Sequence, residues 1–213
     1  MIIFAALTQL QIIFIIIASV VVAVGLFLAI FIPFTHLSHK LRFNLYCYKL
    51  VYKVALYRDY YLVNNFLIRV DQDHFINVDH VLFGEKFIYI IMDQYYNGDL
   101  MGSGSDQDLI LFSHKGEKSY VDNPYFSGNK LLSRFSTTTG ISTDLLIGVH
   151  IVNDSCRMNI QSNSRQFYMV KRKHFKKLIK KVESRDVSDI RADQLQEAVK
   201  IVNEMNERNM KKK

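Results

Sequence analysis

Two acidic residues, Asp79 and Asp93, accompany a pair of short apolar segments with the layout of a β-hairpin. Asp79 lies in the first segment, 75–83, and Asp93 directly follows the second, 86–92, with a turn at Gly84 between them. Carboxylates on the two strands of a hairpin can hold Mg²⁺ against a phosphate, and a lysine two residues after the second carboxylate can orient or deprotonate the attacking water. The hairpin is therefore the candidate catalytic site.

The residues around this hairpin follow an order that can be compared with a known family. The order resembles the nuclease-related domain, or NERD, in which a strand with Ile-Asp-His is followed by a glycine turn, a strand ending in Glu-x-Lys, an aromatic residue, a glycine and a later Asn-Pro. The resemblance covers roughly 60–154 and implies a restriction-endonuclease-like fold. The matching residues are Val78-Asp79-His80, Gly84, 87–91, Tyr96, Gly98, Gly102 and Asn123-Pro124.

The resemblance also implies that the catalytic groups are incomplete. It places Asp79 at the first carboxylate, Met92 at the second and Gln94 at the lysine. Strand side chains alternate between faces, so Asp93 should point away from the side shared by Met92 and Gln94 unless a β-bulge turns it. The family's acidic residue on the preceding helix has no counterpart in 40–57. We therefore expect a degenerate nuclease site without a bound metal or other cofactor.

Three functions remain open at this point. The first is an inactive domain that binds a nucleic-acid or protein partner at a membrane. The second is a nuclease that uses Mg²⁺, held by Asp79 together with Asp93 or with a carboxylate from elsewhere, such as Asp99 or Asp106. The third is a structural subunit of a larger membrane assembly.

The N-terminal region predicts a membrane anchor. Residues 1–38 contain no Asp, Glu, Lys or Arg, and the run Ile12–Phe34 is apolar apart from Ser19 and Gly25. A helix rises about 1.5 Å per residue, so this run would be roughly 34 Å long, enough for a bilayer core of about 30 Å. A cleaved signal peptide is the alternative, but its charged start is absent and its apolar region is shorter.

Positive charge after the apolar run sets the expected orientation. Lys40, Arg42, Lys49 and Lys53 follow the run, whereas no charged side chain precedes it. The positive-inside rule then places the N-terminus outside and the main domain in the cytoplasm, as a single-pass protein of the cell membrane.

A second group of positive charges lies near the C-terminus. The net charge of the whole chain is +7, which suits an acidic membrane surface or nucleic acid without selecting either. The group can contact phosphates or anionic lipid, or it can be the solvated face of an amphipathic helix. Its members are Lys171, Arg172, Lys173, Lys176, Lys177, Lys180 and Lys181.

Hydrophobic periodicity indicates the elements that carry these residues. Helical spacing is expected over 40–57, 123–139, 175–182 and 195–205, and strands over 60–70, 109–112, 145–152 and 167–170 besides the hairpin. The fold class is α/β or α+β, a mixed central sheet flanked by helices after one N-terminal transmembrane helix. The expected parts are an anchor (1–36), an amphipathic juxtamembrane helix (37–58), a NERD-like core (59–170) and C-terminal helices with a basic tail (171–213).

The cysteines, one histidine and a group of glycines could take part in catalysis or ligand binding, but the sequence favours a structural role for each. Cys47 and Cys156 are far apart in sequence and are expected to be reduced thiols. His150 lies inside an apolar strand, which favours a core histidine over a metal ligand. The glycines of 102–106 lack the spacing of a phosphate-binding loop, so this segment is expected to be a simple loop.

Overall fold

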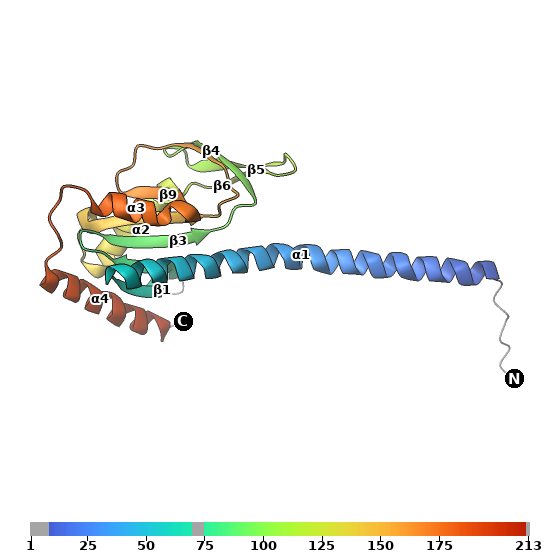
Figure 1. Cartoon of the computed structure of the whole chain (residues 1–213), viewed down its shortest axis with the longest axis horizontal. Helices are drawn as coiled ribbons and strands as arrows, with labels where there is room; N and C mark the ends of the chain where they lie inside the picture. The colour runs from blue at the N-terminus through green and yellow to red at the C-terminus, as the bar shows by residue number, and fades with distance from the viewer. Residues whose placement is uncertain (1–8, 70–74, 212–213) are drawn as a thin grey trace. The chain divides into compact units, whose positions relative to one another are not determined.

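The computed structural model describes residues 9–69 and 75–211, and within them all side chains except those of 9–12 and 30–38. Contacts divide the chain into two units, Met1–Arg42 and Phe43–Lys213. Helix α1, Gln9–Arg58, has residues in both units (Figure 1). The sequence Asp71-Gln72-Asp73 is typical of a turn, and it lies outside the described residues.

The described part of the first unit is the N-terminal part of α1. Residues 13–29 are helical and exposed along their whole length. In the described part of the chain, no helix combines the length and the apolar character needed to cross a membrane. The transmembrane helix expected over Ile12–Phe34 is thus not found there, and the side chains of Ile12 and of 30–34 lie outside the described residues.

The second unit is built on a five-stranded mixed sheet. The first three strands are antiparallel, and the last two are parallel to β3. The expected hairpin and the fully buried strand that follows it are both confirmed. In order across the sheet, the strands are β1 (Tyr61–Arg69), β2 (Phe75–Phe83), β3 (Ile88–Gln94), β7 (Leu146–Val152) and β9 (Phe167–Lys171).

Helices cover both faces of this sheet (Figure 1). The C-terminal part of α1 and helix α3, Phe175–Glu183, pack on one face around Cys47, Val51 and Ile179. Helix α2, Pro124–Thr139, and helix α4, Ala192–Met210, pack on the other. The α/β architecture with helices on both faces of a mixed sheet is therefore confirmed, while its assignment to the restriction-endonuclease-like superfamily stays a prediction.

A second, four-stranded mixed sheet departs from the sequence-based expectation. The segment 102–106 was expected to be a loop, but 98–103 form β4, which pairs with β5 and β8. Apolar side chains under this sheet form their own core around Leu100, Leu109 and Cys156. In order across the sheet, the strands are β6 (Lys118–Asp122), β5 (Asp108–Ser113), β4 (Gly98–Ser103) and β8 (Met158–Gln161).

Asparagines of α4 cover the outer edge of β1. The Leu67 N–H donates to Asn206 Oδ1 at 3.1 Å, and Asn209 Nδ2 donates to the Leu67 carbonyl at 2.7 Å. An open strand edge presents unpaired backbone groups that attract other strands. The asparagines satisfy both backbone groups of Leu67 and hold α4 against the sheet.

Candidate functional site

The β2–β3 hairpin brings Asp79 and Asp93 together through the backbone. The ladder between the strands ends at the pair His80–Ile91. Beyond it, Asp79 Oδ2 accepts a hydrogen bond from the Asp93 N–H at 2.7 Å. The Asp79 carboxylate thus accepts the hydrogen bond that a backbone carbonyl would accept in a continued ladder. The contact joins a carboxylate to a backbone amide, and it does not bring two carboxylates to one metal.

Met92 and Gln94 do not supply the missing catalytic groups. Met92 is half-buried and packs against the apolar core on the α2 and α4 side of the sheet. Gln94 is exposed at the end of β3. Neither carries a charge, and the pattern inferred from the resemblance therefore holds one carboxylate, Asp79, and no lysine.

Asp93 points to the opposite face, as strand alternation predicts. Its Oδ2 lies 3.2 Å from His80 Nε2, and its side chain is only 4% exposed. The other ring nitrogen of the histidine, Nδ1, lies 2.6 Å from Asn64 Oδ1 on β1. Cys47 of α1 lies against Asp93. These four residues, Cys47, Asn64, His80 and Asp93, form a buried polar cluster between α1 and the sheet.

The buried polar cluster has the properties of a structural element. Burial raises the pKa of the Cys47 thiol, and the negative charge of Asp93 raises it further. A protonated thiol is neither a nucleophile nor a metal ligand. Among the described residues, no group of three or more His, Cys, Asp or Glu side chains could hold a metal ion. The cluster therefore pairs most of its buried polar groups with one another, while Asp93 Oδ1 has no hydrogen-bond partner in the described structure.

The two other carboxylates considered for a nuclease lie on the second sheet. Asp99 Oδ1 accepts a hydrogen bond from the Arg157 N–H at 3.1 Å. Asp106 Oδ2 accepts one from the Ser103 N–H at 2.8 Å. Each carboxylate supports its own loop, and the described contacts of neither include Asp79 or Asp93.

The seven C-terminal cations extend from the end of β9 along α3. Lys171 ends β9, Arg172 and Lys173 belong to the 3₁₀-helix Arg172–His174, and the other four lie on α3. The apolar side of α3 packs in the core through Phe175, Ile179 and Val182. All five lysines from 173 to 181 are exposed. Packing of the apolar side therefore accounts for the position of α3, and the basic side remains accessible to a ligand.

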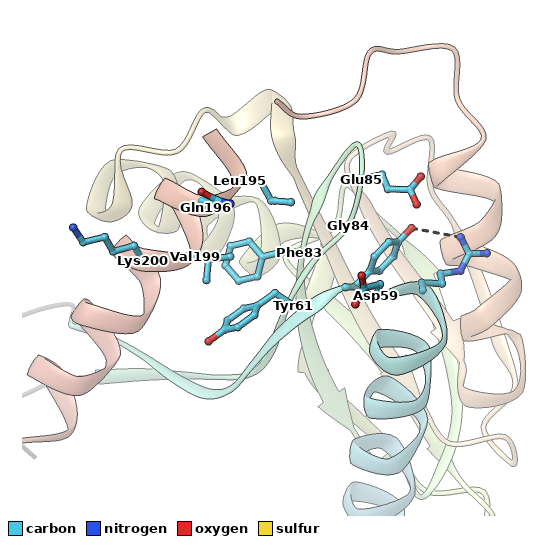
Figure 2. Close-up of a pocket in the computed structure, with 11 residues that line it drawn as sticks. Asp59, Tyr61, Phe83, Gly84, Glu85, Leu195, Gln196, Val199 and Lys200 are labelled. Carbon is cyan, nitrogen blue, oxygen red and sulfur yellow. Dashed lines mark hydrogen bonds between the residues drawn. The ribbon is translucent and has the colours of Figure 1, made fainter. Parts of the chain in front are cut away.

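An apolar hollow of about 510 Å³ lies between α4 and the first two strands. Figure 2 shows Leu195 and Val199 of α4 on one side of it and Tyr61 and Phe83 on the other. The sequence-based predictions placed no functional residue here. Glu183, a buried carboxylate nearby, accepts hydrogen bonds from Tyr89 Oη and the Lys86 N–H.

A glutamate at position 92 is expected to destabilise the protein without restoring a metal site. Met92→Glu places a carboxylate against the apolar core, which should lower the free energy of unfolding by about 1–3 kcal/mol. Urea unfolding followed by circular dichroism, with and without Mg²⁺, measures this change. Gln94→Glu at the exposed end of β3 is the control and should change stability by less than about 0.5 kcal/mol. Recovery of Met92→Glu stability on adding Mg²⁺ would contradict the interpretation.

Comparisons with known proteins were made against family models, curated proteins and solved structures. No family model matches the chain, and neither a curated protein nor a solved structure gives a significant match.

Proposed function

We propose that the chain is a catalytically inactive domain of NERD type that binds nucleic acid at a membrane. The observation that carries the binding proposal is the open basic face of 171–181. Of its seven cations, only Arg172 forms a salt bridge with a carboxylate within the described part of the chain. Lysines free of such partners can neutralise phosphates and release the counterions condensed on a nucleic acid.

The state of the hairpin supports the absence of catalysis. Asp79 is engaged with the Asp93 amide, and Met92 packs in an apolar core. A hard dication such as Mg²⁺ requires several oxygen ligands. Asp79 alone does not provide them, so the proposed domain retains the architecture of a nuclease and uses it for binding.

The N-terminal segment supports the proposed location. Its large apolar side chains are exposed, including Ile13, Phe14 and Phe27 at 55–66% of their surface. Exposed apolar surface of this extent is unfavourable in water and favourable in lipid. The cations that follow the segment, from Lys40 to Lys53, favour the cytoplasmic side of the membrane for the second unit, as expected for positive charge next to an apolar segment.

The test is a titration of the full-length chain with labelled single- and double-stranded DNA and RNA at several salt concentrations, with and without Mg²⁺ or Mn²⁺. We expect binding that weakens with salt and no cleavage under any condition. The variant Lys177→Gln/Lys180→Gln/Lys181→Gln should bind single strands about tenfold more weakly and reduce the log–log salt slope by about 2. Metal-dependent cleavage that Asp79→Ala abolishes would show that the domain is a nuclease.

A matched control distinguishes the effect of the basic face on binding from the effect of the chain's net charge. The variant Lys115→Gln/Lys118→Gln/Lys130→Gln removes the same charge from exposed lysines of β6, the turn before it and α2. It should bind within about twofold of the wild type, because its lysines lie outside the proposed contact surface. Equal losses in the two variants, or no binding at low salt, would contradict the proposal.

A further inference from the structure

A basic hollow of about 480 Å³ lies between the C-terminal part of α1 and the start of α3. It joins cations that are more than a hundred residues apart in the sequence. Five of its lining residues carry positive charge and one carries negative charge. The lining residues are Tyr46, Lys49, Leu50, Lys53, Asp154, Arg172, Lys173 and Lys176.

The single carboxylate of this basic hollow is already saturated. Asp154 Oδ2 accepts hydrogen bonds from Arg172 Nε at 3.1 Å and Nη2 at 2.8 Å, and Oδ1 accepts one from the Lys173 N–H at 2.9 Å. Partial burial acts to raise the Asp154 pKa, but these hydrogen bonds and charges outweigh it and hold the pKa below its ordinary value. Asp154 therefore stays ionised and fixes Arg172, leaving the four lysines unneutralised.

The lysines have no other carboxylate partner in the described part of the chain. Salt bridges there join other residues, and Lys49, Lys53 and Lys173 take part in none of them. Lys176 lies over the Tyr57 ring at 5.9 Å. Like charges gathered around one hollow repel each other, and an anion bound among them relieves that repulsion.

Aromatic contacts prearrange the cations of the basic hollow. The Arg172 guanidinium lies 5.1 Å from the centre of the Tyr46 ring while its nitrogens bind Asp154. Arg172 is thus held from two sides and loses little freedom on binding an anion. The α1 lysines belong to the helical stretch whose buried side includes Cys47 and Val51, so their backbone is fixed by the core.

We propose that the basic hollow binds a compact ligand with two or more linked phosphate groups. A single phosphate carries at most two charges at neutral pH, whereas four lysines and Arg172 face the hollow against one carboxylate. The hollow is also large enough for a small molecule. This site shares Arg172, Lys173 and Lys176 with the proposed nucleic-acid surface but goes beyond it, because Lys49 and Lys53 of α1 also line it and Lys177, Lys180 and Lys181 do not.

The experiment measures binding of inorganic tripolyphosphate to the full-length chain by calorimetry and by the shift in Tm at near-physiological salt. We expect saturable binding with one site and a raised Tm. Lys49→Gln/Lys53→Gln should weaken binding at least tenfold, and both positions are exposed, so the variant should fold. Lys177→Gln/Lys181→Gln removes the same charge outside the hollow and should bind within twofold of the wild type.

Linked phosphates can belong to a lipid headgroup or to a soluble molecule, and binding to vesicles distinguishes the two. Vesicles with phosphatidylinositol bisphosphate are compared with phosphatidylserine vesicles of equal surface charge, each with and without tripolyphosphate. If tripolyphosphate displaces the protein from the phosphatidylinositol bisphosphate vesicles and not from the phosphatidylserine vesicles, the ligand is a lipid headgroup. If the protein binds tripolyphosphate but shows no preference between the vesicles, the ligand is a soluble molecule. Either result supports the site. No tripolyphosphate binding, or equal losses in the two variants, overturns it. Failure of nucleic-acid binding with tripolyphosphate binding intact would overturn the proposed function alone.

Discussion

A Gly148→Val variant is expected to lose more than about 3 kcal/mol of unfolding free energy. A Cβ atom at Gly148 in β7 would lie 2.3 Å from Cδ2 of Phe167 in β9, and one at Gly128 in α2 would lie 2.0 Å from Cε2 of the same ring. Phe167 is only 2% exposed, so its ring has little room to move away. The two glycines thus make the space that lets α2 pack over the parallel strands.

Urea unfolding followed by circular dichroism measures this loss. Gly25→Val in α1 is the matched control, because no heavy atom lies within 4 Å of a Cβ there. A double-mutant cycle tests the cause: Gly148→Val should cost much less in a Phe167→Ala background, since the ring that it strikes is gone. Additive losses in the double variant would show that the clash with Phe167 is not the reason.

Much of the first sheet could be predicted because its elements have clear local signals. Two short apolar runs separated by the turn at Gly84 predicted the hairpin, and the apolar run before Asn153 predicted β7. In the second sheet, the apolar run 109–112 predicted β5, but β4, β6 and β8 lack such signals. Strand β4 contains Gly98 and Gly102, both with positive φ (156° and 143°), and β8 has only four residues. A Cβ at Gly98 would lie 2.1 Å from the Phe112 carbonyl oxygen, so glycine here permits close strand pairing and does not mark a turn.

The candidate site was predictable only where strand alternation decides it. Alternation correctly placed Asp93 on the face away from Met92. It gave no indication that Asn64 and Cys47 would meet His80 and Asp93, because those contacts depend on β1 pairing with β2 and on α1 packing over the sheet. The basic hollow has the same origin. Its α1 lysines were notable in sequence only as charges after an apolar run, and the fold brings them beside Arg172.

Stability is expected to fall steeply on acidification from about pH 6.5 to pH 4, mainly because of His150. This side chain of β7 is buried, and in the described structure its Nδ1 has no hydrogen-bond partner. Burial lowers the His150 pKa to about 4. The unfolded chain therefore binds a proton in this range that the folded chain excludes, and stability rises with pH across it. The difference in pKa corresponds to about 3 kcal/mol.

Another buried group has a shifted pKa with the opposite effect on stability, so the measurement must isolate His150. Burial raises the Glu183 pKa above its ordinary value, and the stability that this carboxyl contributes is present at low pH and is lost as pH rises through the folded pKa. Glu183 thus opposes His150. Unfolding free energies of the wild type and His150→Leu should lie close together above pH 6.5 and separate toward pH 4, where only the wild type loses stability to this group, with the exposed His114→Leu as control. Parallel curves for the wild type and His150→Leu would show that His150 does not cause the acid sensitivity.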